Sequence, residues 1–241
     1  MNPWLTPDWP APANVRACVT TRAGGVSAEP FDSFNLGDHV GDEPVAVAEN
    51  RRRLTAELGC QPAWLSQVHG IEVVEADPSV VATADASWSE TPGVACTIMT
   101  ADCLPALFCD RAGTRVAAAH AGWRGLAGGV LEATVDALGV APGELLVWLG
   151  PSIGPQAFEV GAEVRDAFLK DHAETERAFL PSANAGKYMA DIYELARIRL
   201  AAKGVTAVYG GGLCTFTDAE RFYSYRRNSR TGRLASLIWL A

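Results

Sequence analysis

Three short segments of the chain each carry one strong metal ligand, and a fold that unites them is tightly constrained. The ligands are His69 in Ser-Gln-Val-His-Gly, Cys103 in Thr-Ala-Asp-Cys and His120 in His-Ala-Gly-Trp-Arg-Gly. Two neutral imidazoles and one thiolate form a donor set that zinc and copper prefer. Three protein ligands leave a fourth position for water or substrate, which is typical of catalytic rather than structural sites. The segments therefore favour a catalytic metal site.

The chemistry of these residues leaves two alternatives open. In a metal-free cysteine hydrolase, His120 would lower the pKa of Cys103, and the thiolate would attack an acyl carbon. In the other alternative, the histidines are ordinary polar residues whose hydrogen bonds are satisfied within the fold. A zinc deaminase of the nucleobase class is a further comparison, but its His-x-Glu and Pro-Cys-x-x-Cys signature is absent from the sequence.

The number of histidines limits what copper could do here. A multicopper oxidase needs roughly ten histidines, many of them in His-x-His pairs. This chain has four histidines and no His-x-His pair, so it cannot build such a centre. A single copper ion at a two-histidine, one-cysteine site could still support weak oxidase activity.

Segments with strand and helix patterns alternate along the chain. Residues 94–100 are almost continuously apolar, which indicates a strand covered on both faces. Residues 104–109 and 115–119 are predicted to form a hairpin through Asp-Arg-Ala-Gly. A helix is predicted over residues 123–138, followed by a buried strand over 145–149.

The ends of the chain complete this pattern. Strands are predicted over 15–20 and 234–240, and a helix over 42–58 with Asp42 as its N-cap. Its buried face is predicted to contain Val45, Ala48, Leu54 and Leu58. No linker or repeat divides the chain, and the hairpin argues against a purely parallel sheet. We therefore expect one domain over residues 1–241, of class α+β, with mixed sheets covered by helices.

Charge and cysteine usage narrow the range of partners and compartments. The chain has 20 basic and 28 acidic residues, a formal net charge of −8, and no basic run that would follow a phosphate backbone. Nucleic acid and membrane are therefore not expected as partners. Neither a signal peptide nor a stretch of about 18 apolar residues is present. The six cysteines form no Cys-x-x-Cys pair, which fits a reducing compartment, and we expect a cytoplasmic protein.

Several other polar residues are candidates for the site. Asp102, next to Cys103, could move a proton during catalysis, or it could hold a metal-ligating imidazole in place. Gln67 is predicted to bind substrate. Arg22 and Arg124 lie beside glycines and could bind phosphate in bidentate fashion, although either could equally form a structural ion pair. For Arg226 and Arg227 a structural role is favoured.

Six segments of the chain form a distinctive set, which consists of residues 20–27, 67–70, 100–103, 120–125, 150–154 and 222–227. Taken together, they resemble the bacterial multicopper polyphenol oxidase (laccase-domain) family, also called the purine nucleoside phosphorylase or peptidoglycan editing factor family. The resemblance extends over nearly the whole chain, in order and at natural spacing.

The resemblance implies a fold and a metal. Members of this family have a single-domain α-β-β-α layered sandwich, similar to the catalytic domain of cytotoxic necrotizing factor. Their zinc ligands correspond here to His69, Cys103 and His120. All three positions are filled in this chain.

The resemblance also implies an activity. The expected reaction is phosphorolysis of adenosine, inosine, guanosine and methylthioadenosine, together with deamination of adenosine. The partners would be purine nucleosides and phosphate. Copper-assisted oxidation of phenols and an accessory role in peptidoglycan editing remain alternatives. The sequence leaves the oligomeric state open, a monomer included.

Overall fold

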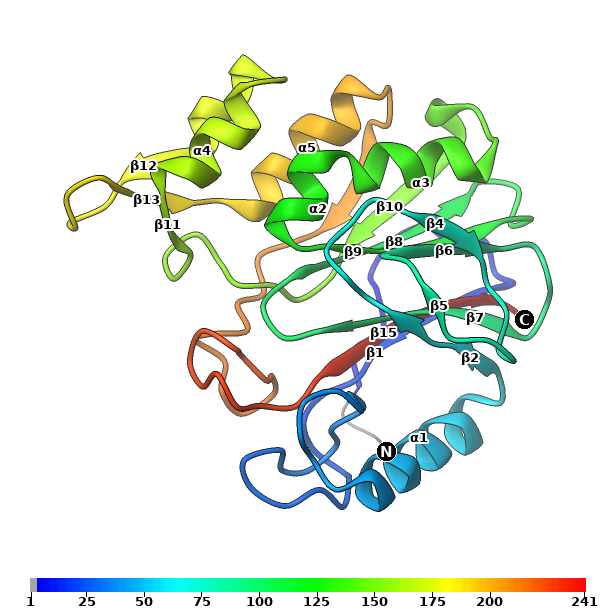
Figure 1. Cartoon of the computed structure of the whole chain (residues 1–241). Coiled ribbons are helices and arrows are strands. Elements are labelled where there is room, and N and C mark those ends of the chain that lie inside the picture. Colours follow the sequence, from blue (N-terminus) through cyan, green and yellow to red (C-terminus); the bar gives the residue numbers. More distant parts are fainter. Residues whose placement is uncertain (1–3) are drawn as a thin grey trace.

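Two β-sheets stacked face to face form the centre of the protein, with helices on both outer faces (Figure 1). The computed structural model describes residues 4–241. The smaller sheet has the order β1 (Val15–Val19), β15 (Leu234–Leu240), β7 (Val94–Thr100) and β2 (Gln61–Ala63). The larger sheet has the order β14 (Ala207–Gly210), β10 (Leu145–Leu149), β8 (Leu104–Asp110), β9 (Val116–Ala121), β6 (Ala86–Ser89) and β4 (Val73–Glu75). Both sheets mix parallel and antiparallel pairs.

An apolar layer fills the space between the two sheets. Ile98 and Ile238 of the smaller sheet meet Leu107 and Val116 of the larger one, and all four are fully buried. The other faces of these strands pack against helices. Burial on both faces explains why β7, β8 and β15 are almost continuously apolar, as predicted for residues 94–100.

Helices cover the two outer faces. The larger sheet is covered by α2 (Trp123–Gly128), α3 (Val130–Leu138) and α5 (Ile192–Ala202), and the smaller sheet by α1 (Pro44–Leu58). The predicted α-β-β-α layering with mixed sheets is therefore confirmed. No helix within residues 4–241 is both long and apolar enough to span a membrane.

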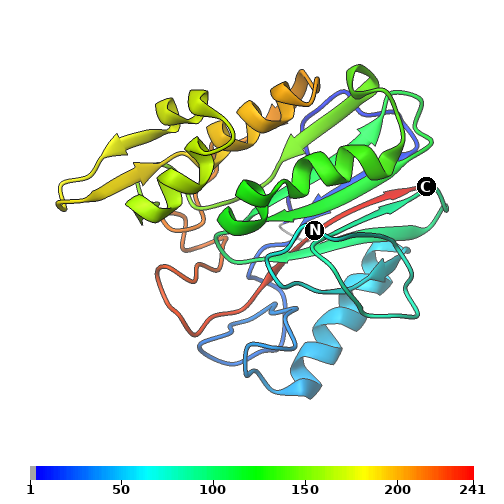
Figure 2. The ribbon, with the colours of Figure 1, turned by 45° about the horizontal axis from the view of Figure 1, so that its top comes forward.

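A small arm projects from the layers beside α5 (Figure 2). It consists of β11 (Glu159–Gly161), α4 (Ala162–Leu169), β12 (Phe179–Pro181) and β13 (Lys187–Ala190), with the 3-10 turn Ala173–Ala178. The remaining elements are the paired strands β3 (Leu65–Ser66) and β5 (Ala82–Thr83), and a second 3-10 turn, Pro142–Glu144.

The helix predicted over residues 123–138 is interrupted. Gly129 has a φ of 104°, a left-handed conformation that ends α2 and begins α3. The periodicity of the apolar residues continues across the break, and the sequence pattern therefore suggested a single helix.

The prediction for α1 was wrong about its N-cap and about two residues of its buried face, Val45 and Ala48, whereas Leu54 is buried as predicted and Leu58 packs partly buried against the same core. Asp42 does not cap the helix, because its carboxylate accepts hydrogen bonds from Ser27 and Asn35. The helix buries Val47, Asn50 and Leu54, whereas Val45 is 82% exposed. The buried Asn50 amide determines this orientation, since it hydrogen-bonds the loop 22–37 through Val26, Ser27, Ser33 and Asn35.

Candidate metal centre

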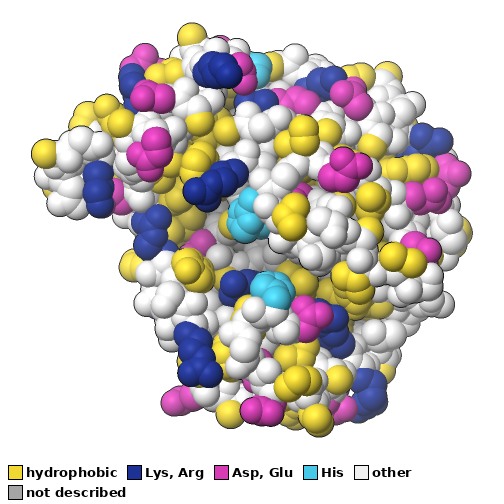
Figure 3. All heavy atoms as spheres, viewed as in Figure 1, with side chains coloured by type: hydrophobic (Ala, Val, Ile, Leu, Met, Phe, Trp, Pro, Cys, Tyr) yellow, Lys and Arg dark blue, Asp and Glu magenta, His cyan; other side chains and the backbone are white. Residues whose placement is uncertain are grey.

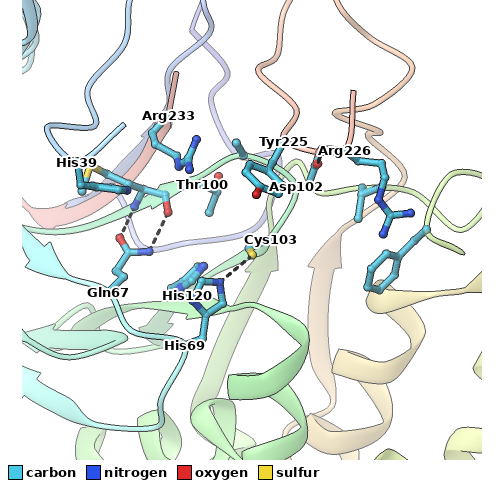
Figure 4. Close-up of a pocket in the computed structure, with 14 residues that line it drawn as sticks. His39, Gln67, His69, Thr100, Asp102, Cys103, His120, Tyr225, Arg226 and Arg233 are labelled. Carbon is cyan, nitrogen blue, oxygen red and sulfur yellow. Dashed lines mark hydrogen bonds between the residues drawn. The ribbon is translucent and has the colours of Figure 1, made fainter. Parts of the chain in front are cut away.

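His69, Cys103 and His120 converge at one point of the fold (Figure 4). One ligand atom from each residue lies within 4.8 Å of the other two, and Cys103 Sγ is 3.6 Å from His69 Nε2. The centres of the two imidazole rings are 4.7 Å apart. Within residues 4–241, no other group of three such ligands comes together in this way. The fold thus unites three residues that are far apart in sequence.

The two central sheets position two of the ligands. His120 lies in β9 opposite Pro105 of β8, and by strand alternation it shares a face with Val116 and Ala118, which point into the layer between the sheets. Cys103 lies in the short turn that joins β7 of one sheet to β8 of the other. The two donors therefore meet at the edge of the inter-sheet layer.

The backbone is strained at two positions of the site. His69 has a φ of 61° and Asp102 a φ of 88°, and no other residue except glycine has a positive φ within residues 4–241. Such conformations cost of order 1–3 kcal/mol each and tend to occur where function requires an unusual geometry. In this protein the two positive φ angles set the orientation of His69 and the path of the turn before Cys103.

Asp85, which the sequence analysis did not identify, holds two of the ligands in place. Its buried carboxylate accepts a hydrogen bond from His120 Nδ1 at 2.8 Å and from the backbone amides of Val68, His69 and Gly70 at 2.6–3.2 Å. With Nδ1 engaged, His120 presents Nε2 to a metal, an arrangement common among metal-bound histidines. Asp85 stands in no recognisable motif, so only the fold reveals its role.

The electrostatics of the cluster favour a thiolate. Burial on its own would raise the pKa of Cys103, but His120 and His69 outweigh that effect and lower it to about 6. Burial would lower the pKa of His120, but Cys103 and Asp85 raise it to about 9. Burial also acts to raise the pKa of Asp85, yet its hydrogen bonds, first that of His120, keep it below the usual range.

The close packing of the site explains the glycine in His-Ala-Gly-Trp. A Cβ atom at Gly122 would lie 2.6 Å from His69 Cδ2 and 3.1 Å from Cys103 Sγ. Any side chain at this position would displace the ligands. The segment His-Ala-Gly-Trp therefore contributes both a ligand, His120, and the space at Gly122 that lets His69 and Cys103 come close to it.

The residues fit one metal ion. A thiolate and two imidazoles, one of them oriented by a carboxylate, match a zinc site with one open coordination position. They do not fit a trinuclear copper centre, which needs many more imidazoles. The group formed by His69, Cys103 and His120 could thus bind a metal, and its donors suit a single catalytic ion.

The ligands face a cavity of about 460 Å³, within the size range of small-molecule sites. Figure 3 shows a hollow on this face of the molecule with histidine and basic side chains around it. The walls come from the ends of β7 and β9, the loops 36–40, 150–158 and 222–233, and the segment around His69. The lining residues are His39, Gln67, His69, Met99, Thr100, Ala101, Asp102, Cys103, His120, Ile153, Phe158, Tyr225, Arg226 and Arg233.

Two of the predicted polar residues line this cavity but are already engaged. The Gln67 amide bonds the backbone of Met99 through both its oxygen and its nitrogen, at 2.8 Å each. The Asp102 carboxylate accepts hydrogen bonds from Thr215 Oγ1, Ser224 Oγ and the Arg226 backbone amide. The carboxylate that orients an imidazole is therefore Asp85, and the predicted alternative role for Asp102 was wrong.

The structure places the two predicted phosphate-binding arginines outside the cavity. Arg22 pairs with Asp32 at 2.9 Å and bonds the carbonyl of Ala219. Arg124 is exposed and stacks on Trp123. The other guanidinium groups considered, those of residues 226 and 227, donate to backbone carbonyls, which fits the structural role favoured for them.

Thiol labelling should distinguish Cys103 from the other cysteines. In metal-free protein at pH 7 its lowered pKa makes it mostly thiolate, and we expect rapid alkylation by iodoacetamide, detected by peptide mass spectrometry. Cys18 and Cys96 are buried with pKa values raised to about 12, so they should stay unmodified in the folded protein.

Half-buried Cys214, whose pKa is also lowered, is an internal control for accessibility. Saturating zinc should block alkylation of Cys103 and leave that of Cys214 unchanged. Equal protection of both thiols, or of neither, would contradict metal ligation by Cys103.

Known proteins resemble this chain over its whole length. A Pseudomonas aeruginosa protein named purine nucleoside phosphorylase is 78% identical over 240 residues, covering 100% of this chain and 99% of its own. The Escherichia coli K12 purine nucleoside phosphorylase YfiH is 56% identical over 244 residues, with complete coverage of both chains. Both relatives carry names that denote an enzyme.

Solved structures and a family model agree with these relatives. The crystal structure of Neisseria meningitidis protein NMB0706 matches with a TM-score of 0.96 at 54% identity, covering 98% of each chain. That of YlmD from Geobacillus stearothermophilus matches with a TM-score of 0.89 at 32% identity, covering 98% of this chain and 96% of the other. The model described as multi-copper polyphenol oxidoreductase laccase matches residues 16–241, and the chain belongs to this family.

Proposed function

We propose that this protein is a zinc-dependent purine nucleoside phosphorylase that also deaminates adenosine. Its substrates would be adenosine, inosine, guanosine and methylthioadenosine, with phosphate as co-substrate. The observation that carries the proposal is the convergence of His69, Cys103 and His120 on the wall of a cavity large enough for a small molecule. The names of the relatives, purine nucleoside phosphorylase, support the choice of reaction.

In phosphorolysis, a phosphate oxygen forms a bond to the anomeric carbon of the ribose as the bond to the purine nitrogen breaks. The products are the free base and ribose 1-phosphate. A metal held by His69, Cys103 and His120 would supply Lewis-acid chemistry at this site. Asp85 keeps the His120 ring fixed, so the donors are preorganised before substrate arrives.

One aromatic side chain of the cavity wall suits a purine base. Tyr225 lines the cavity with its side chain 55% exposed, whereas Phe158 lines it but is buried beneath Arg226. An exposed aromatic ring at a cavity offers a face on which a purine can stack. Asp102 directly precedes Cys103 and lines the same cavity (Figure 4), and a role for it in moving a proton stays part of the proposal.

The test is direct. Zinc-loaded protein incubated with inosine and phosphate should release hypoxanthine and ribose 1-phosphate, which chromatography detects. Incubated with adenosine in the absence of phosphate, it should form inosine. His120→Ala is the control, because it removes a ligand. No product above that of the control would refute the proposed function.

A further inference from the structure

Arg233 places a positive charge in the same cavity as the three metal ligands. It lies directly before β15, and its side chain reaches toward the space that Cys103 and His120 face (Figure 4). Arg226 also lines the cavity, but its guanidinium stacks over Phe158 and donates to the carbonyls of Ala157 and Glu159. Of the two arginines that line the cavity, Arg233 is therefore the one whose guanidinium is available to a bound molecule.

The Arg233 side chain is held in place from two directions. Its Nη1 donates to the carbonyls of Thr231 and Gly232 at 3.0 and 3.1 Å. Its backbone amide donates to Asn35 Oδ1 at 2.8 Å. The aliphatic stem packs on Gly37, where an added Cβ would lie 2.7 Å from Arg233 Cγ. The guanidinium is thus positioned before any ligand binds.

Arg233 forms no salt bridge within residues 4–241, although burial, which lowers the pKa of Arg233, is partly opposed by the Cys103 thiolate of the same cavity and by Asp102. Among residues 4–241, no carboxylate lies within ion-pair distance of Arg233, whereas Arg22 and Arg51 each have an aspartate partner. Asp102 shares the cavity, but three donors from other residues cover its carboxylate. The structure describes no hydrogen bond within residues 4–241 from Nε or Nη2 of Arg233. A half-buried arginine of this kind is suited to a bound anion.

We propose that Arg233 binds inorganic phosphate in this cavity, which locates the co-substrate of the proposed phosphorolysis and therefore rests on that function. The fork of guanidinium donors matches two phosphate oxygens at once. This site replaces the two positions that the sequence suggested, since Arg22 is paired with Asp32 and Arg124 lies outside the cavity. It also puts the anion beside the ligands that would hold the metal.

Calorimetric titration of zinc-loaded protein with inorganic phosphate tests the proposal. Losing a charge-assisted contact should weaken phosphate binding about 10- to 100-fold in Arg233→Gln, and Arg233→Lys should retain part of the affinity. Arg16→Gln, at an exposed position in β1, makes the same charge change elsewhere and should bind like wild type. Affinity of Arg233→Gln within twofold of wild type would overturn the proposal.

A measurement on the wild-type protein tests the proposal independently of whether the Arg233→Gln variant folds. Phenylglyoxal should modify Arg233, and inorganic phosphate should slow that modification without slowing that of Arg16. Binding of a nucleoside 5′-monophosphate through Arg233, with no binding of inorganic phosphate, would also overturn the proposal, because the anion would then be part of a nucleotide.

Kinetics separate this inference from the proposed function. Arg233→Gln should raise the KM for phosphate at least tenfold and change the KM for inosine little. Phosphorolysis with an unchanged KM for phosphate would refute the role of Arg233 and leave the function intact. Phosphate binding that depends on Arg233, in a protein without phosphorolysis, would support the anion site and refute the function.

Discussion

Asp85→Asn should weaken zinc binding about 10- to 100-fold, the range found when a carboxylate behind a metal-bound histidine is lost. The carboxylate accepts four hydrogen bonds, one from His120 and three from consecutive amides at residues 68–70. Asparagine has one acceptor oxygen and presents an NH₂ group where acceptors are needed. The substitution would therefore remove the hydrogen bonds that orient the His120 ring and those that fix the strained backbone at His69. Competition with a chromophoric chelator measures the affinity.

The same substitution should lower the free energy of unfolding by about 3 kcal/mol, because it leaves buried donors without a partner. The pKa of Asp85 is below its usual value, so its contribution to stability is present above about pH 4 and is lost as the pH falls through the native pKa. The variant should lose that acid dependence. Urea titrations at several pH values measure both effects.

Asp110→Asn is the matched control for Asp85→Asn. Asp110 is also buried, accepts bonds from Thr114 and Arg115, and has a lowered pKa, but it lies at the end of β8 remote from Leu104 and the site. It should reduce stability and leave zinc affinity unchanged. Equal losses of zinc affinity in both variants would show that Asp85 acts through general stability alone.

Removal of the metal should lower the melting temperature on the order of 10 °C. A ligand present at 1,000 times its Kd and bound only to the folded state contributes about 4 kcal/mol, and each kcal/mol shifts a domain of this size by roughly 2–4 °C. The ligands come from three separate segments, so the unfolded chain cannot reproduce the site. Scanning calorimetry with zinc and with excess chelator gives the shift.

Cys103→Ser supplies the control for metal removal, because it should melt at the same temperature with zinc and with chelator. Elemental analysis of wild-type protein purified without added metal should find about one zinc per chain. A chelator-sensitive melting temperature in Cys103→Ser would exclude Cys103 as a ligand. Copper in place of zinc would favour the phenol oxidase alternative.

The parts of the fold that follow from local pattern could be predicted from the sequence. The apolar runs gave β7, β10 and β15 with the predicted bounds, because strands buried on both faces have a distinctive composition. The face of α1 could be predicted only in part: Leu54 is buried as expected, but Asn50 is buried by contacts with a loop fifteen or more residues away. Tertiary hydrogen bonds outweighed the apolar periodicity there.

For the candidate site, too, some residues could be predicted from local sequence and others depend on tertiary contacts. His69, Cys103 and His120 could be picked from the sequence because each is a strong donor in a glycine-containing or turn-forming segment. Asp85 and Arg233 could not, since neither stands in a distinctive motif and both depend on contacts between remote segments. Arg22 was chosen for the glycines beside it, but the fold provides Asp32 as its ion-pair partner.

The candidate metal ligands and the aromatic residues of the cavity wall belong to different parts of the architecture. Cys103 and His120 are fixed at the edge of the stacked sheets, whereas Phe158 lies next to the projecting arm and Tyr225 in the long connection before β15. The arm packs on the same core as the larger sheet, and Phe222 and Tyr223 of the connection are fully buried, so only exposed positions such as Tyr225 can change without disturbing the sheets. Exposed positions of this cavity wall could therefore vary among related proteins while the candidate metal centre stays the same.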